Sequence, residues 1–500
     1  MKKLNYVSIL VFLIAICALQ IDNCFSQWSS DFRISNSLQN SYSNSKSIAT
    51  YGNYVHVVYD DERDGNLEIY YRRSTDAGIT WGSETRLTNS SGVSGYSSID
   101  VISSTIYIFW HDGRHGSSEF EIYYKFSTDN GNTWSTDIRL TNATWHSANP
   151  IVALNGQDVY VTWWDQRGGV NPEIYFNRKS GSGPFGVDVR LTNNPFRSEE
   201  PHIAVSSDSV LHIAWWDNRD GGSGEIYYKR SSNKGTGWSA DTRLTFNTKS
   251  TYPAISASGQ IVVISWEDIR DNNREIYYKR STDDGLTWGP DTRLTNTTYA
   301  SWHPSTFFSG NILHLVWAEA IATGIGRVYY KRSLDAGVTW DTNTQIVPSQ
   351  SYLDYPSVSA SGQCVHVFWQ DCRFGALPEV FYKRNPTANI VNIQNINNEI
   401  PCSFKLYQNY PNPFNPITKI KFEIPNNAVI ARSGATWQSL TVSLKIFDIL
   451  GKEITTLVNE QLQPGTYEVT FDGSNFPSGI YFYQLQSGDF VETKKLILLR

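Results

Sequence analysis

The chain has 500 residues, of which 18% are charged and 14% are aromatic, and its formal net charge is −6. This length is too great for one hydrophobic core and predicts at least two domains, and the aromatic content excludes a disordered chain. The acidic balance provides no basic face, so we expect no nucleic-acid partner.

Residues 1–26 are predicted to be a secretory signal peptide. Lys2 and Lys3 form a charged start, and the apolar stretch 7–19 is shorter than the roughly 20 residues that a membrane-spanning helix needs. Small residues precede Gln27 and suit cleavage there. We therefore expect export with no transmembrane segment after cleavage; a membrane anchor is the alternative.

An eight-residue segment recurs through the next part of the chain. Clear copies are STDAGITW at 74–81, STDNGNTW at 127–134, STDDGLTW at 281–288 and SLDAGVTW at 333–340, with degraded copies at 180–185 and 231–238. The spacing of about 52 residues is typical of a solenoid, propeller or array. Each unit holds four short β-runs rich in β-branched and aromatic residues, which favours a propeller.

A second pattern, Trp-x-Asp-x-Arg, ends the second β-run of each unit and counts the units independently. Its copies begin at Tyr59, Trp110, Trp163, Trp215, Trp266, Trp317 and Trp369. The seventh unit lacks a fourth β-run, whereas residues 28–36 match the fourth run at 288–296. Because closure removes open strand edges, we predict an all-β, seven-bladed propeller over 27–388 whose last blade is completed by residues 30–36 pairing near 379–384.

The remainder of the chain has a different composition. Residues 389–404 are rich in Asn and are predicted to be a linker, and the alternating strands of 405–500 predict an immunoglobulin-like β-sandwich. Cys364 and Cys372 flank one predicted strand and cannot bond if that strand is straight. A bridge that involves Cys402 stays open.

Two resemblances to known families follow from these residues. The motif Ser-x-Asp-x-Gly-x-Thr-Trp resembles the Asp-box, or bacterial neuraminidase repeat, of sialidase-like propellers. The segments NYPNPFNPITKIKFEIP (409–425), FDILGKEITTLVNEQLQPGTYEVTFDGSNFPSGIYFYQL (447–485) and KKLILL (494–499) resemble the type A C-terminal sorting domain of type IX secretion. This second resemblance implies Sec export, the type IX machinery as a partner, and a secreted or outer-membrane surface location in a Gram-negative bacterium.

The repeated turn motif is interpreted as structural. Its Asp caps backbone N–H groups, its Gly takes a positive φ and its Trp packs between blades. The family resemblance implies that these turns lie on the face opposite the ligand site. The residues assigned to this role are Asp76, Gly78, Trp81, Asp129, Gly131, Trp134, Asp283, Gly285, Trp288, Asp335, Gly337 and Trp340.

The Asp-x-Arg pairs invite a role in binding carboxylates. However, the six blades that carry such a pair also begin the third run with a Glu, as Glu275 follows Arg270 in blade five. Blade six has Ile321 in place of the Arg and Arg327 in place of the Glu. This joint loss predicts that Arg and Glu pair within each blade. No spacing matches a metal site or a cofactor motif, so we predict neither.

Variable loops that lead into the first β-run of each unit are the candidate ligand site. Aromatic rings beside polar groups suit sugars, and packing between blades is the alternative. Glu199 and Glu200 would point to opposite faces of a regular strand and make a poor acid/base pair. The candidates are Trp145, His146, Arg197, Glu199, Glu200, Tyr252, Trp302, His303, Asp354 and Tyr355.

Three hypotheses for function remain. We expect a non-catalytic module that binds glycans or surface proteins, because the arginines are spread evenly over the blades, whereas the resemblance implies that a sialidase needs three converging on one carboxylate. The alternatives are an exo-acting, sialidase-like glycoside hydrolase that uses the axial face, and a structural surface protein. Two or three carboxylates that converge near the axis would favour the hydrolase.

Overall fold

The computed structural model of the protein describes residues 28–499, except 117–118, 207–208, 223, 247–248, 323–324, 349–350, 376, 387, 389–392, 398–400, 402, 416, 426–428, 431–437, 440, 463–464 and 474–475. The predicted signal peptide and Cys402 lie outside this part. The described residues form β-strands and loops, and they contain no helix with the length and apolar character to cross a membrane. Cys364 and Cys372 are free.

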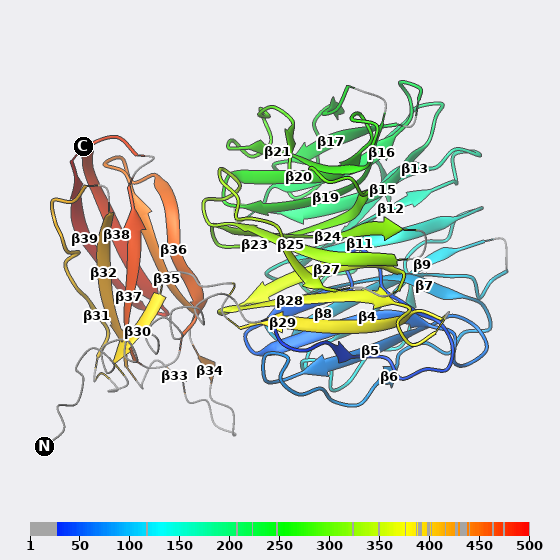
Figure 1. Ribbon diagram of the computed structural model, residues 1–500, viewed down its shortest axis with the longest axis horizontal. Coiled ribbons are helices and arrows are strands. Elements are labelled where there is room, and N and C mark those ends of the chain that lie inside the picture. Colours follow the sequence, from blue (N-terminus) through cyan, green and yellow to red (C-terminus); the bar gives the residue numbers. More distant parts are fainter. Residues whose placement is uncertain are drawn as a thin grey trace, which may run out of the picture.

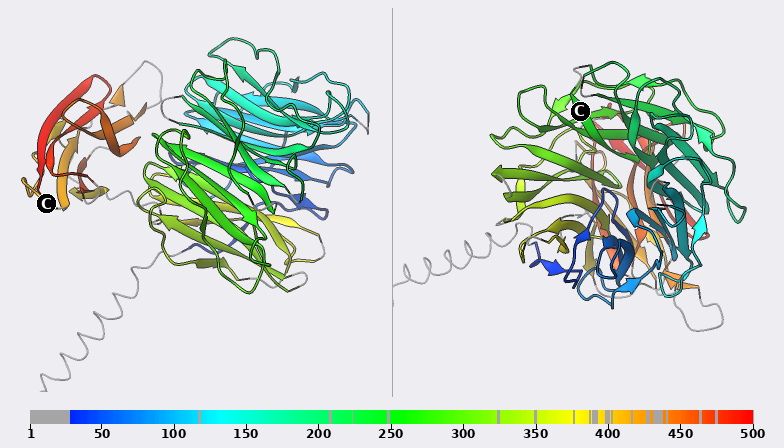
Figure 2. Two further views of the ribbon diagram at one scale, coloured as in Figure 1. Left: turned by 90° about the horizontal axis from the view of Figure 1, so that it is seen from above. Right: turned by 90° about the vertical axis from the view of Figure 1, so that its right-hand side faces the viewer.

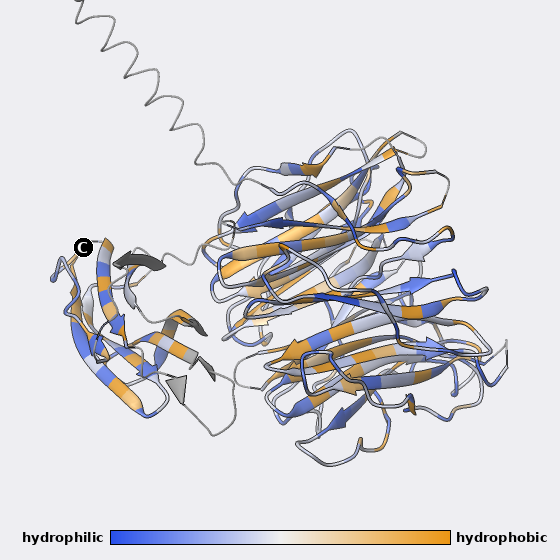
Figure 3. Cartoon of the chain, turned by 90° about the horizontal axis from the view of Figure 1, so that it is seen from below, coloured by the Kyte–Doolittle hydropathy of each residue, from blue (hydrophilic) through white to orange (hydrophobic). Residues whose placement is uncertain are grey.

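Seven antiparallel sheets follow one another around a common centre and form the seven-bladed propeller that the sequence predicts (Figures 1 and 2). Strand one of each blade lies innermost and strand four outermost. Apolar residues, orange in Figure 3, lie mainly on the strands. The second strands carry fully buried Trp residues such as Trp110, Trp266 and Trp369, which fill the spaces between blades.

The strands of the first four blades have the following bounds. Blade one contains β2 (Ser41–Tyr42), β3 (Ile48–Tyr51), β4 (Tyr54–Asp61), β5 (Glu68–Ser74) and β6 (Thr85–Arg86). Blade two contains β7 (Ser94–Ile102), β8 (Thr105–Asp112), β9 (Glu121–Ser127) and β10 (Ile138–Arg139). Blade three contains β11 (Ser147–Asn155), β12 (Asp158–Asp165), β13 (Glu173–Lys179) and β14 (Val189–Arg190). Blade four contains β15 (Ser198–Val205), β16 (Leu211–Asp217), β17 (Glu225–Ser231) and β18 (Thr242–Arg243).

The last three blades complete the ring. Blade five contains β19 (Ser250–Ser258), β20 (Ile261–Asp268), β21 (Glu275–Ser281) and β22 (Thr292–Arg293). Blade six contains β23 (Ser301–Ser309), β24 (Ile312–Ala322), β25 (Ile325–Ser333) and β26 (Thr344–Val347). Blade seven contains β27 (Leu353–Ser361), β28 (Cys364–Asp371), β29 (Glu379–Asn385) and, from the N-terminus, β1 (Phe32–Arg33).

The N-terminal strand closes the ring, as the sequence predicts. Phe32 of β1 lies opposite Tyr382 of β29 in an antiparallel pair. Asp31, just before β1, accepts a bond from Lys383 Nζ at 2.7 Å. In blade five the acid at the same place is Asp291, which bonds to Lys279 on strand three of its own blade. The donated strand therefore supplies both the pairing and the charge that the seventh blade lacks.

A buried aspartate at the end of strand two organises six of the blades. In blade five, Asp268 accepts hydrogen bonds from Trp266 Nε1 (3.0 Å), Ser250 Oγ (2.9 Å) and Arg270 Nη2 (2.6 Å). Arg270 also bonds to Asp291 at 2.8 Å. The equivalent aspartates, each bonded to its own Arg, are Asp61, Asp112, Asp165, Asp217 and Asp371. This network joins the start of strand one to the end of strand two.

The prediction that these arginines pair with the Glu of strand three is wrong. In blade five, Glu275 accepts a bond from Arg293 Nη2 of strand four at 2.7 Å, whereas Arg270 is held by Asp268 and Asp291. Both charges are paired within the blade, but through different partners. The antiparallel register between strands three and four decides this pairing, and sequence spacing does not reveal that register.

The repeated turn motif locks each blade to the preceding one. Asp76 accepts the backbone N–H and the hydroxyl of Thr80, at 2.8 and 2.6 Å. Gly78 has φ 79°, and a Cβ there would lie 1.8 Å from the Tyr382 hydroxyl of blade seven. Trp81 packs edge-on against the same tyrosine, with ring centroids 4.7 Å apart. The motif therefore caps its own turn and fixes the spacing between blades.

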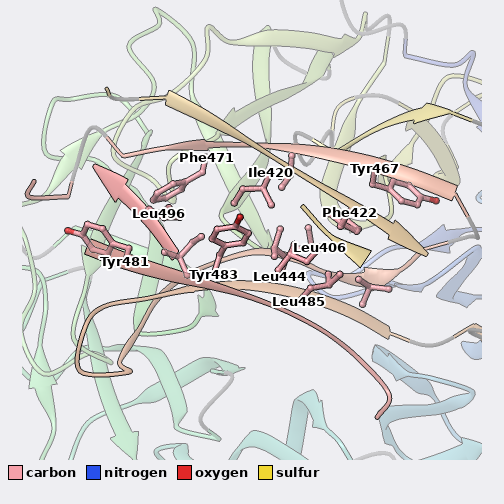
Figure 4. Close-up of a cluster of buried hydrophobic side chains, with 14 of the residues drawn as sticks. Leu406, Ile420, Phe422, Leu444, Tyr467, Phe471, Tyr481, Tyr483, Leu485 and Leu496 are labelled. Atoms are coloured by element: carbon pink, nitrogen blue, oxygen red, sulfur yellow. The ribbon is translucent and has the colours of Figure 1, made fainter. Parts of the chain in front are cut away.

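The C-terminal domain is a β-sandwich of two four-stranded sheets. One sheet holds β30 (Ile393–Asn397), β37 (Gly465–Asp472), β32 (Ile417–Ile424) and β31 (Lys405–Leu406); the other holds β36 (Glu453–Gln461), β35 (Thr441–Phe447), β38 (Gly479–Ser487) and β39 (Phe490–Leu498), while β33 (Val429–Ile430) pairs with β34 (Gln438–Ser439). Figure 4 shows its core, in which Phe422, Leu444 and Tyr483 are buried. The stretch 389–404, predicted as a linker, contributes β30 to this sandwich.

We expect Arg270→Ala to destabilise the propeller by about 3 kcal/mol, because it leaves the buried Asp268 without its cation. The control is Lys234→Ala, which removes a cation from a more exposed pair with Asp158 and should cost less than about 1 kcal/mol. Urea denaturation of both variants measures the difference. Equal losses would contradict the scaffold role of the Asp–Arg network.

Candidate functional site

A repeated β-bulge in the innermost strand places one residue per blade near the axis. The pairing between strands one and two shifts at this point in blades two to seven. The bulged residue has φ between 46 and 53° in all six blades. Left-handed backbone is strained for residues other than Gly, and such strain gathers at functional sites. We call this set the axial ring; it consists of Tyr96, Asn149, Glu200, Tyr252, His303 and Tyr355.

The axial ring converges on His303. Its Nδ1 bonds to Asp354 Oδ1 at 2.5 Å, which orients the imidazole. The ring of Tyr355 stacks on it with centroids 4.1 Å apart, and Tyr252 meets it edge-on at 4.6 Å. Glu267 of β20 accepts the His303 backbone N–H at 2.7 Å, and its carboxylate also lies 3.8 Å from Nε2. The histidine of blade six is thus held by residues of its two neighbours, blades five and seven.

The electrostatics show that the acids of this cluster lie near one another. Burial and then the nearby Glu267 carboxylate raise the pKa of Glu200 from 4.5 to about 8. Burial also raises the pKa of Glu267. Burial alone would lower the pKa of His303, but Asp354 and the two glutamates raise it. The charge of Glu200 is the largest cause of the raised pKa of Tyr252. Three carboxyl groups therefore surround one histidine.

In blades one and five, the middle residue of the Trp-x-Asp pattern supports the bulge of the following blade. Glu267 does this for His303, as described above. Asp60 of blade one accepts the backbone N–H of Tyr96 at 2.7 Å and the Ser97 hydroxyl at 2.7 Å. Burial raises the pKa of Asp60. Capping of this kind satisfies the backbone groups that a bulge leaves unpaired.

The sequence-predicted candidates divide into two groups. The structure brings Glu200, Tyr252, His303, Asp354 and Tyr355 together at the axis. Because the bulge begins after Glu199, the regular alternation expected for Glu199 and Glu200 does not apply there.

The other candidates lie away from this cluster. Arg197 pairs with Glu199 at 2.5 Å. His146 packs against Phe120 at the border of blades two and three, and Trp145 is exposed. Trp302 points away from the axis and packs against the core of blades six and seven.

Sequence reasoning missed Glu267, Tyr96 and Asp60. The first and last stand inside a repeated motif that was interpreted as scaffold. A usable signal exists, because the ring residue follows a Ser by two positions and precedes a Pro in four consecutive blades. Those Ser-x-x-Pro segments begin at Ser147, Ser198, Ser250 and Ser301. Position-specific variation inside such repeats marks the site.

The arginines of this face are occupied by the scaffold or by neighbouring acids. Each Arg of the Asp-x-Arg pairs binds its own Asp, and Arg274 binds Glu267 at 3.0 Å. The six scaffold pairs are those of Arg63, Arg114, Arg167, Arg219, Arg270 and Arg373. The axial cluster is therefore rich in acids and tyrosines and carries His303 as its central base.

The C-terminal residues 408–499 match the model of the secretion system C-terminal sorting domain. The C-terminal domain is a type IX sorting domain. This sorting domain directs secretion or attachment to the cell surface. The chain as a whole matches no curated protein.

Solved structures similar to the chain are β-propellers. An ulvan lyase of family PL25 bound to a GlcA–Rha3S saccharide is 10% identical, with a TM-score of 0.51, and the match covers 71% of this chain and 95% of that one. Polysaccharide lyase Uly1 is 10% identical, with a TM-score of 0.50, and the match covers 72% of this chain and 100% of that one. A Hadza microbial sialidase is 16% identical, with a TM-score of 0.41, and covers 61% and 66%. At these identities the likeness concerns the fold alone.

The raised pKa of Glu200 predicts a pH-dependent stability. The folded protein keeps this proton up to about pH 8, whereas an unfolded glutamate loses it near 4.5, so stability falls as the pH rises between these values. We expect Glu200→Gln to make this decline shallower and to raise stability at pH 8 by on the order of 3 kcal/mol.

Urea denaturation at several pH values between 4 and 9 measures this effect. Glu119→Gln is the control, because Glu119 is exposed. If the free energy of unfolding depends on pH in the same way in the wild type and in Glu200→Gln, the buried, acid-flanked environment assigned to Glu200 is contradicted.

Proposed function

We propose that the propeller is an exported or surface-attached module that binds a neutral carbohydrate at the axial ring. One observation carries this proposal: the six equivalent bulge positions hold four polar or aromatic residue types, Tyr, Asn, Glu and His, and three of these residues, Tyr252, His303 and Tyr355, pack together. Tyrosines beside hydrogen-bonding groups match sugars, which offer apolar C–H faces and hydroxyls.

The charge of the cluster favours an uncharged ligand over an anionic one. Glu267 and Asp354 face one histidine, and the nearby Arg274 is already paired with Glu267. Recognition of a carboxylate or sulfate relies on guanidinium groups that are available to the ligand. A sialic acid or uronic acid would meet acids here instead, so a neutral glycan suits the site better.

A glycoside hydrolase is the second candidate, and the convergence of three carboxyl groups favours it. Such enzymes need one protonated acid and one ionised carboxylate near the scissile bond. The raised pKa of Glu200 keeps it protonated at neutral pH, which suits the acid. Asp354 bonds to His303 Nδ1 at 2.5 Å and orients the imidazole.

Affinity electrophoresis tests the binding proposal. The 27–388 segment is expected to be retarded by at least one of β-glucan, mannan, xylan and arabinan. Polygalacturonate and hyaluronate in the gel should leave its electrophoretic mobility unchanged. Tyr252→Ala should lose the retardation, because it removes a ring from the axial cluster. Phe246→Ala is the control, since Phe246 is exposed and lies outside the axial ring. Retardation only by the acidic polymers would contradict the proposal.

Turnover of aryl glycosides decides between binding and hydrolysis. If the protein is a hydrolase, neutral aryl glycosides are cleaved and Glu200→Gln abolishes cleavage while the retardation by polysaccharide persists. If it is a binding module, none is cleaved. In both cases we expect no release of sialic acid from an aryl sialoside, because the arginines are paired with acids. Release of sialic acid would contradict the assignment of those arginines to the scaffold.

A further inference from the structure

Blade six lacks the Asp–Arg pair that the other blades share, and a cleft lies beside the end of its second strand. Ile321 occupies the position of the arginine, and Glu319 the position of the buried aspartate. The hairpin of β24 and β25 continues beyond this point, with Ala322 paired to Ile325. An open cleft of about 340 Å³ lies between this hairpin and the start of blade seven.

The cleft is lined by aromatic and aliphatic side chains. Trp302, Tyr299 and Tyr352 provide three rings, and Ile321 and Ile325 provide aliphatic surface. Its lining includes no charged residue. Tyr299 is 38% exposed and Tyr352 is 43% exposed, so both rings are open to solvent. A site of this size, with three aromatic rings and no charged side chain in its lining, matches an uncharged sugar ring.

Two residues connect the cleft with the axial ring. Trp302, which lines the cleft, immediately precedes His303 of the axial ring. Trp302 is the last regularly paired residue of β23 before the bulge, and His303 lies in the bulge. The Tyr352 hydroxyl donates to Asp354 Oδ2 at 2.6 Å, and Asp354 holds His303. An oligosaccharide bound at the axial ring would therefore reach the cleft with its next sugar residue.

We propose that this cleft is a second subsite, which holds one uncharged sugar ring next to the ring bound at the axis. The inference rests on the proposed carbohydrate binding and specifies it: the ligand is an oligosaccharide of at least two neutral residues.

Affinity as a function of chain length tests the subsite. Gluco-, manno-, xylo- and arabino-oligosaccharides of one to six residues are titrated by calorimetry into the purified full-length protein. For the series that binds, we expect affinity to rise about 10-fold when the chain first reaches the cleft, the size of one aromatic stacking contact. Ile321→Trp fills the cleft and should remove this rise. Tyr299→Ala should reduce it, because it removes an exposed ring from the rim.

Val170→Trp is the matched control, since Val170 is exposed in the corresponding loop of blade three. This variant should show the same dependence of affinity on oligosaccharide length as the wild type. An unchanged length profile in both Ile321→Trp and Tyr299→Ala, with binding still lost in Tyr252→Ala, would overturn the subsite alone. Failure of the wild type to bind any oligosaccharide of the four series would refute the carbohydrate proposal and the subsite together.

Discussion

The buried aspartate at the end of strand two is the constraint on which the propeller depends. In blade five, Asp268 is fully buried and binds a Trp indole, a Ser hydroxyl and an Arg guanidinium at once. A buried charge is tolerated only when it is paired and hydrogen-bonded, so these partners are required together. The Ser begins the innermost strand, and the bulge follows two residues later. In blades two to five, where this Ser–Asp bond is present, the aspartate thereby fixes the place at which the axial-ring residue leaves the regular strand.

This arrangement separates the scaffold from the site within each repeat. The scaffold positions are the same in nearly every blade because one network must be satisfied each time. The residue on the bulge and the middle residue of Trp-x-Asp are not part of that network, so their identity is free to differ between blades. Around His303 this freedom gathers Glu200, Glu267 and Asp354. In blade six the Asp–Arg pair itself is missing, and a cleft lined by Trp302 lies beside the end of the second strand.

The sequence predicted the blade number, the closing N-terminal strand and the C-terminal sandwich, because regular spacing and composition carry that information. It also selected Tyr252, His303 and Asp354 as candidates from their variability. It assigned the wrong partner to Arg270, since the choice between Glu275 and Asp291 depends on a strand register that spacing does not encode. The convergence of acids at the axis was not predicted, because a bulge redirects the side chains that regular alternation would send to opposite faces.

A crystal structure of the propeller with a retained neutral oligosaccharide tests the central claim most directly. The account predicts sugar density against Tyr252, Glu200 and His303, with the Asp268–Arg270 pair unchanged beside it. Density bound instead at the face of the repeated turns, or held by an Arg released from its aspartate, would contradict the separation of scaffold and site.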